Sequence, residues 1–130
     1  MNEVHIIMEP TVMQYGSLSM ALLPWICADN YEPSMSFIRD CKADWLGAHL
    51  ELANFEIGRG ILAPHGMDAK IFKKFEQVLS GHYHTASRRD NIWYLGNPME
   101  FFWSDAHDPK FFHILDTCLL YTSPSPRDTE

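Results

Sequence analysis

Short apolar runs separated by polar turns fill the chain from Met1 to Thr117, and they predict a mixture of strands and helices. The runs that predict strands are Val4 to Met8, Leu18 to Trp25, Trp45 to Leu50, Glu76 to Ser80, Ile92 to Leu95 and Lys110 to Leu115. Strand, helix, strand and then a hairpin is the order of an α/β layered domain with some antiparallel edges.

Two segments carry the spacing of a helix. In Pro33 to Lys42, Met35 and Ile38 lie three residues apart and face a core. Asp68 is a candidate N-cap for a second helix from Ala69 to Phe75. The expected apolar face of that helix consists of Ile71, Phe72 and Phe75, and its expected solvent face consists of Lys70, Lys73 and Lys74.

Composition and charge narrow the function classes. A chain of 130 residues with 46% hydrophobic residues can bury one small core. The formal charge of -7 argues against a surface that holds nucleic acid by charge alone, so any phosphate chemistry needs positive charge from elsewhere, such as bound metal. Three cysteines without Cys-x-x-Cys spacing support neither a disulfide framework nor a thiolate zinc site. No apolar run is long enough to span a membrane, and we expect a soluble, intracellular protein.

The last residues differ from the rest. Cys118 to Glu130 is rich in Pro and Ser and has no periodicity. Back-translated, its first eleven residues match the transposon-end adapter of common sequencing libraries. We therefore interpret residues 118–130 as a non-native tail and residues 1–117 as the domain. A natural disordered tail is the alternative.

Three of the seven histidines form a candidate metal site. In an extended segment, residues two apart point to the same side, so His82 and His84 can converge on one cation. Gly81 before them permits close packing and an unusual backbone angle. His49 also follows a short apolar strand, and ligands bind at such strand ends in open α/β sheets. For the His-x-His pair alone, an ordinary polar hairpin is the alternative.

An ordered set of motifs resembles the calcineurin-like metallophosphoesterases, and more narrowly the SbcD-like nuclease subunit of phage recombination endonucleases. The motifs are His49 after a strand, Gly81-His82-Tyr83-His84, Tyr94-x-Gly96-x-Pro98 and Asp108-Pro109-Lys110-x-Phe112. Leu23-Pro24-Trp25, Glu51-Leu52-x-x-Phe55 and His65-Gly66 fit the same phage group. The resemblance runs from about Glu3 to Thr117.

This resemblance implies a partial layered β-sandwich of the metallophosphoesterase type, flanked by helices. It also implies a DNA nuclease of phage recombination and repair that uses two divalent metal ions, usually Mn2+. His49 and His82 would bind one ion and His84 the other, with Tyr83 and the Gly96-Asn97-Pro98 loop nearby but not ligands. The implied partners are DNA and an SbcC-like coiled-coil ATPase, in the cytoplasm of an infected bacterium.

The chain departs from the family pattern at its front. The earlier motifs, with their Asp, Asn and catalytic His residues, have no counterpart here. We therefore expect Met1 to be internal to a longer protein, the chain to be the C-terminal part of a catalytic domain, and the fragment to be inactive. A noncatalytic scaffold subunit, or a phosphomonoesterase or cyclic-nucleotide phosphodiesterase of the same superfamily, are the alternatives.

Two further segments are candidates for substrate contacts. Arg88 and Arg89 follow the His-x-His motif and could touch a phosphate backbone, although an exposed polar hairpin tip is the simpler interpretation. The run Phe101-Phe102-Trp103 could stack on a base or dock a partner, but packing in the core or at a domain edge is favoured.

Overall fold

A computed structural model of the protein describes residues 3–119 and, for the backbone alone, residues 121–126. The chain is a mixed α/β protein built on a multi-stranded sheet with few helices, as the sequence predicts. Among the described residues, no helix is both long and apolar enough to cross a membrane.

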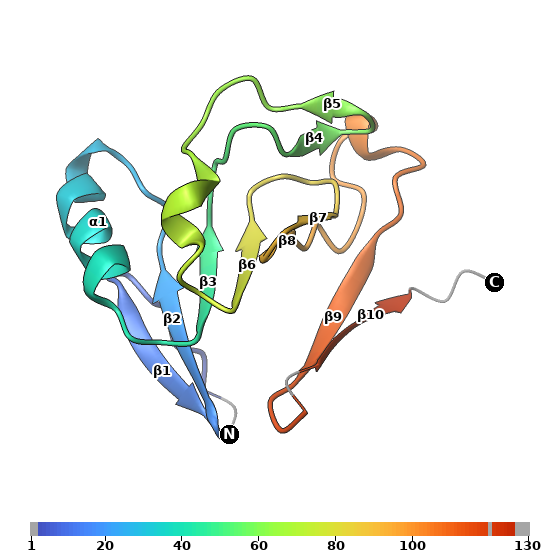
Figure 1. The fold of residues 1–130 in the computed structure, drawn as a ribbon. Coiled ribbons are helices and arrows are strands. Elements are labelled where there is room, and N and C mark those ends of the chain that lie inside the picture. The colour runs from blue at the N-terminus through green and yellow to red at the C-terminus, as the bar shows by residue number, and fades with distance from the viewer. Residues whose placement is uncertain (1–2, 120, 127–130) are drawn as a thin grey trace.

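The main sheet has six strands in the order β1-β2-β3-β6-β8-β7 (Figure 1). They are β1 (Thr11–Tyr15), β2 (Leu18–Leu23), β3 (Trp45–His49), β6 (Gln77–Gly81), β8 (Ile92–Tyr94) and β7 (Ser87–Arg89). The four central strands, β2, β3, β6 and β8, run parallel, whereas β1 and β7 close the two edges antiparallel. All four parallel strands therefore end at one edge of the sheet.

The remaining elements cover this sheet or extend from it. One α-helix, α1 (Tyr31–Asp40), is accompanied by short 3-10 turns at Ala28–Asn30, Ala69–Phe72 and Trp103–Asp105. Two hairpins lie outside the main sheet, namely β4 (Glu56–Gly58) with β5 (Ile61–Leu62), and β9 (Phe111–Asp116) with β10 (Tyr121–Pro126).

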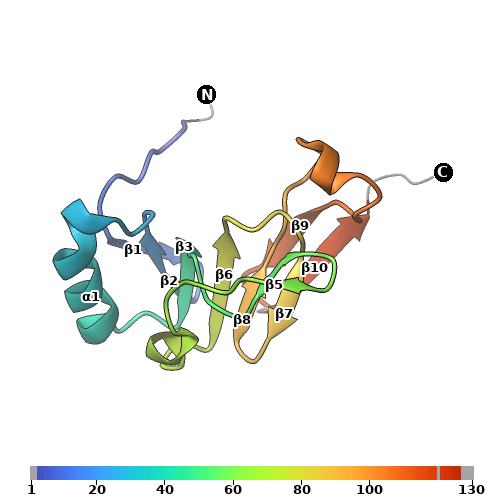
Figure 2. The same cartoon turned by 90° about the horizontal axis from the view of Figure 1, so that it is seen from above.

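Apolar side chains pack on both faces of the sheet. Consecutive residues of a strand point to opposite faces, so Val78 enters the larger core with Ile38 of α1, while Leu79 packs with Trp45 on the other face. Figure 2 shows α1 and the Ala69–Phe72 turn on one side of the sheet and β9–β10 on the other. Val78 and Leu79 are both buried. Burial on both faces explains why the parallel strands are almost continuously apolar.

The expected strand from Val4 to Met8 is wrong. This segment has no strand partner, and Val4 is 88% exposed. The structure instead places β1 at Thr11–Tyr15, where the turn at Gly16 pairs it with β2 as a hairpin. An apolar run makes a strand only where a neighbouring strand can accept its hydrogen bonds.

The second expected helix is a single 3-10 turn. Asp68 does cap it, accepting a hydrogen bond from the Lys70 backbone N–H at 2.9 Å. Phe72 and Phe75 are buried as predicted, but Ile71 is 40% exposed. Lys70, Lys73 and Lys74 are exposed as predicted. The Lys74 ammonium also donates to three backbone carbonyls at the end of α1, those of Ile38, Arg39 and Cys41. The last carbonyls of a helix lack partners within the helix, so Lys74 caps the C-terminal end of α1.

The C-terminal segment contains a strand where the sequence predicts none. The backbone of β10 pairs antiparallel with β9 from Tyr121↔Asp116 to Pro126↔Phe111. Residues 120 and 127–130 lie outside the described part of the chain. The division into a domain of residues 1–117 and a non-native tail stays a prediction.

Candidate functional site

Two of the three predicted ligand histidines meet at the carboxyl edge of the sheet. His49 ends β3 directly beside Gly81, which ends the parallel strand β6. The ring of His82, the next residue, lies with its centroid 5.2 Å from that of His49, at an interplanar angle of 89°. Parallel pairing thus brings together two imidazoles that are 33 residues apart in the chain.

Gly81 makes room for the His49 ring. A Cβ atom at this position would lie only 2.9 Å from His49 Nδ1. The close packing predicted for Gly81 is therefore confirmed, but the unusual backbone angle is found one residue later. His82 has a φ of +92°, in a region that residues other than glycine rarely adopt. Strained backbone of this kind is concentrated at functional sites.

This strain predicts the effect of two substitutions at position 82. His82→Gly should be more stable than His82→Ala by about 1 kcal/mol, because glycine accepts a positive φ without steric cost. Urea unfolding of both variants measures the difference. At His113, within strand β9, the order should reverse, because glycine weakens a strand. An alanine variant at position 82 as stable as the glycine variant would show that the backbone there is not strained.

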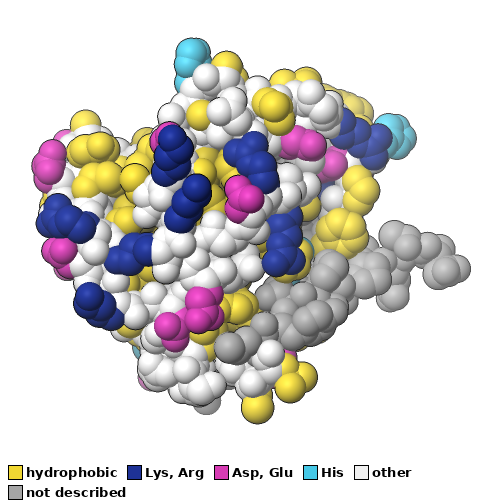
Figure 3. All heavy atoms as spheres, viewed as in Figure 1, with side chains coloured by type: hydrophobic (Ala, Val, Ile, Leu, Met, Phe, Trp, Pro, Cys, Tyr) yellow, Lys and Arg dark blue, Asp and Glu magenta, His cyan; other side chains and the backbone are white. Residues whose placement is uncertain are grey.

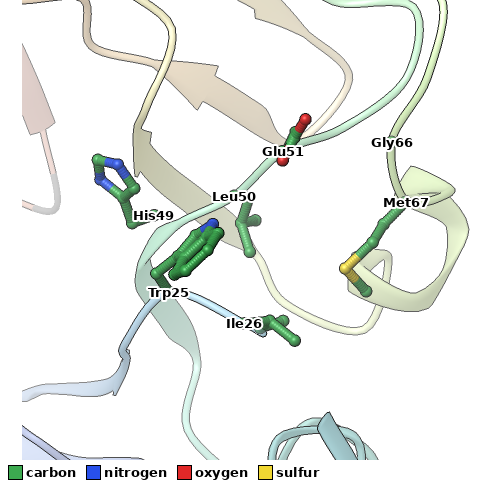
Figure 4. Close-up of a pocket in the computed structure, with 7 residues that line it drawn as sticks. All are labelled: Trp25, Ile26, His49, Leu50, Glu51, Gly66 and Met67. Carbon is green, nitrogen blue, oxygen red and sulfur yellow. The ribbon is translucent and has the colours of Figure 1, made fainter. Parts of the chain in front are cut away.

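The environment of His49 keeps its imidazole neutral. Burial lowers the pKa of His49, and the neighbouring His82 lowers it further. A neutral imidazole has a lone pair to offer a metal ion. His49 also lines a cavity of about 220 Å³ (Figure 4). Its other lining residues are Trp25, Ile26, Leu50, Glu51, Gly66 and Met67.

Two tyrosines hold the backbone that follows His49. Tyr94 Oη donates to the Leu50 carbonyl at 2.7 Å and accepts from the Leu52 N–H at 3.2 Å. Tyr83 Oη donates to the Leu52 carbonyl at 2.8 Å. The Tyr83 hydroxyl thus bonds to the backbone, and its ring lies against that of His82. This position agrees with the resemblance, which implies that Tyr83 lies near the site without being a ligand. The role of Tyr94 is not visible in the sequence, because its contacts lie more than 40 residues away.

Removing the Tyr94 hydroxyl should destabilise the fold. Tyr94→Phe leaves a buried N–H and a buried carbonyl without a partner, which should cost about 1 to 3 kcal/mol. Burial also raises the pKa of Tyr94 in the folded state, so its stabilising contribution is present below about pH 10 and is lost as the pH rises further. Urea unfolding should show that the difference in free energy of unfolding between wild type and Tyr94→Phe is smaller at alkaline pH than at neutral pH. A constant difference would contradict this prediction.

His84 has a different set of partners. Its Nδ1 lies 3.1 Å from Oδ1 of the buried Asp105, and its ring stacks on Phe102 with a centroid distance of 5.5 Å. The Gly96-Asn97-Pro98 loop lies close by, as predicted, because the Asn97 N–H donates to the His84 carbonyl. His82 and His84 both line a second cavity of about 510 Å³, together with Asp105 and Asp108.

Asp105 and Lys110 form a buried charge cluster that the sequence does not reveal. Hydrogen bonds outweigh burial, which alone would raise the pKa, and they hold the Asp105 pKa well below its usual range. The donors are the backbone N–H groups of Phe101 and Phe102 and the side chains of Asn97 and His84. Lys110 Nζ lies 2.6 Å from Asp108 Oδ2, 2.9 Å from the His84 carbonyl and 3.7 Å from Asp105 Oδ1. The only signal in the sequence is the Asp108-Pro109-Lys110 motif.

The three histidines do not by themselves form a metal-binding cluster. Within residues 3–119, no group of three or more His, Cys, Asp or Glu side chains is placed to hold one ion. The donor chemistry of His49 and His82 fits a divalent metal, since both are imidazoles and that of His49 is neutral. Their assignment as ligands, with His84, stays a prediction.

The two candidate arginines lie away from the histidines. Arg89 pairs across β7–β8 with Ile92, which pairs with Val78 near the start of β6, whereas His82 follows the end of β6. Arg89 stacks over Phe55 and donates to the Asn54 carbonyl at 2.9 Å, while Arg88 lies over Trp93. Basic side chains on the face shown in Figure 3 alternate with acidic ones. A phosphate contact by Arg88 or Arg89 stays a prediction.

Of the two positions favoured for Phe101-Phe102-Trp103, the core is wrong, and packing at a domain edge stays a prediction. Phe101 is 57% exposed, Phe102 65% and Trp103 96%. The reason is that the backbone of this segment wraps around the Asp105 carboxylate, to which the Phe101 and Phe102 N–H groups donate. The backbone faces inward there, and the aromatic side chains face outward beside His84.

Comparison with known proteins finds one that is similar in sequence over most of this chain. Over 121 residues, or 93% of its length, the chain is 31% identical to exonuclease subunit 1 of Enterobacteria phage T4. This chain is related to a phage exonuclease subunit. The match covers 35% of the T4 protein, so the chain spans about a third of the length of this relative. No family model and no solved structure matches the chain.

Proposed function

We propose that this chain is part of a DNA nuclease of the calcineurin-like metallophosphoesterase type, which hydrolyses phosphodiesters with two divalent metal ions, most suitably Mn2+. His49 and His82 hold one ion and His84 holds the other. The similarity to a phage exonuclease subunit supports a nuclease-related role. DNA as the substrate and a role in phage recombination and repair are part of the proposal. DNA and an SbcC-like ATPase are the proposed partners of the whole protein.

The contact between His49 and His82 carries this proposal. Two imidazoles from adjacent parallel strands meet at the sheet edge where ligands bind in α/β proteins, and Gly81 provides the space for them. A strained backbone at His82 has no evident structural purpose, but it aims this side chain toward His49.

Cations also reconcile an acidic chain with a DNA substrate. With a formal charge of -7, the protein repels phosphates at long range. Divalent ions, when bound, supply Lewis-acid stabilisation of the phosphate charge. The imidazoles position the ions but bring no negative charge, so a complete site also needs the carboxylate ligands of the earlier family motifs, which have no counterpart in this sequence. The chain alone is accordingly expected to be inactive.

Metal binding can be tested on the chain itself. Titration with Mn2+, followed by NMR of the histidine rings, should broaden the signals of His49, His82 and His84 before those of the exposed His5. In Gly81→Ala, the His49 signals should no longer broaden before those of His5, since the added Cβ displaces the His49 ring. Gly47→Ala on the neighbouring strand is a matched control, because its Cβ meets mainly the flexible end of Met20. Equal broadening of His5 and the three candidates would refute the metal site.

The nuclease activity requires a longer protein. A chimera in which this chain replaces the matching third of T4 exonuclease subunit 1 should cleave DNA in Mn2+. His84→Ala in that chimera should reduce cleavage about 100-fold or more, whereas His5→Ala should leave it unchanged. Hydrolysis of small phosphomonoesters without cleavage of DNA would favour a phosphatase. If neither the chimera nor its variants showed any metal-dependent hydrolysis, a scaffold subunit would be favoured.

A further inference from the structure

A buried carboxylate lies behind His84. The side chain of Asp105 is 3% exposed, and that of His84 is 36% exposed. Asp105 Oδ2 accepts from the Phe101 N–H at 2.9 Å, the Phe102 N–H at 3.0 Å and Asn97 Nδ2 at 3.2 Å. Its other oxygen, Oδ1, lies 3.1 Å from His84 Nδ1.

These contacts determine the proton position on the His84 ring. An ionised carboxylate is an acceptor only, so His84 Nδ1 must carry a hydrogen to bond it. The hydrogen bonds to Oδ2 keep Asp105 ionised. In the neutral ring the remaining nitrogen, Nε2, then has a free lone pair.

The same cluster also holds the ring still and makes its surroundings negative. Lys110 donates to the His84 carbonyl at 2.9 Å, and Phe102 stacks on the imidazole at an interplanar angle of 9°. Asp105 and Asp108 carry two formal negative charges and Lys110 one positive charge, which leaves one negative charge beside His84. Such an environment favours a cation at the open side of the ring.

We propose that Asp105, supported by Lys110, is a positioning residue that fixes His84 as the Nδ1–H tautomer, so that Nε2 binds a divalent cation. This inference rests on the proposed function, in which His84 is a metal ligand. It adds the atom that binds and the group that prepares it. Ligating histidines commonly donate their second nitrogen to a carboxylate, which fixes both tautomer and orientation.

The tautomer can be measured on this chain without metal. Long-range ¹H–¹⁵N NMR of the deprotonated ring should show His84 as the Nδ1–H tautomer. In Asp105→Asn, the amide oxygen will take the place that accepts the Phe101 and Phe102 N–H groups, which turns the amide N–H₂ toward His84. Nδ1 then becomes an acceptor, and His84 should change to the Nε2–H tautomer. Asp108→Asn, which does not alter this contact, should retain Nδ1–H.

A Mn2+ titration of the same proteins tests the consequence for binding. Broadening of the His84 ring should require roughly tenfold more Mn2+ in Asp105→Asn than in wild type, while His49 and His82 respond as before. An Nε2–H tautomer in the wild type, or equal Mn2+ sensitivity of His84 in the two proteins, would overturn the role of Asp105. The wild-type tautomer decides the matter even if the variant does not fold. Absence of selective broadening at all three histidines would instead refute the proposed function.

Discussion

Gly66→Ala is expected to destabilise the protein by about 3 kcal/mol or more, because alanine there meets both a strained backbone and a steric clash. Gly66 has a φ of +138°, and an added Cβ would lie 2.7 Å from the Glu51 carbonyl oxygen and 2.8 Å from the Ala53 nitrogen. Those backbone atoms cannot move freely, since Met67 is hydrogen-bonded to Glu51 and Ala53 on either side. Urea unfolding of wild type and variant measures the loss.

A second glycine separates the clash from the strain. Gly60 has a φ of +70°, but a Cβ there would meet nothing within 4 Å. Gly60→Ala should therefore cost only about 1 kcal/mol. Gly66 also lines the cavity beside His49, so its alanine variant should weaken the Mn2+ response of His49 as well. Equal losses at the two glycines would show that backbone strain alone, without the clash, accounts for the effect at Gly66.

Lys110→Met is expected to destabilise the protein by about 3 to 5 kcal/mol, because it removes one partner of a buried ion pair. The side chains of Lys110 and Asp108 are 2% and 9% exposed, and their charged atoms lie 2.6 Å apart. Methionine has a similar length but leaves Asp108 as an uncompensated carboxylate and removes one of the two donors to the His84 carbonyl, the other being the Asn97 N–H. Thermal or urea unfolding measures the loss.

The double variant Lys110→Met with Asp108→Asn distinguishes charge from packing. If the uncompensated charge causes the loss, neutralising Asp108 should recover part of it. Lys73→Met, at an exposed lysine, should change stability by less than about 0.5 kcal/mol. If the double variant is no more stable than Lys110→Met, the loss comes from changed packing and from the missing hydrogen bond to the His84 carbonyl.

The periodicity of the chain determined the elements that carry the core. Central strands are buried on both faces and leave dense apolar runs, which is why β2, β3, β6 and β8 could be predicted nearly to their ends. The Val4 to Met8 run fails because a strand needs a partner, and local pattern does not report partners. The 3-10 turn at Ala69–Phe72 is shorter than the predicted helix. Lys74 beyond it is exposed as predicted, but its ammonium also bonds to the end of a distant helix, which the local pattern does not report.

For the candidate site, the sequence by itself determined which side chains could bind a metal, because residue type and position at a strand end are local properties. Only the tertiary structure decided how they are arranged. Parallel pairing placed His49 against His82, and the strain appeared at His82 and not at Gly81. Asp105 reaches His84 across 21 residues of chain. Strand pairing and buried hydrogen bonds join residues far apart in the chain, so no local pattern contains them.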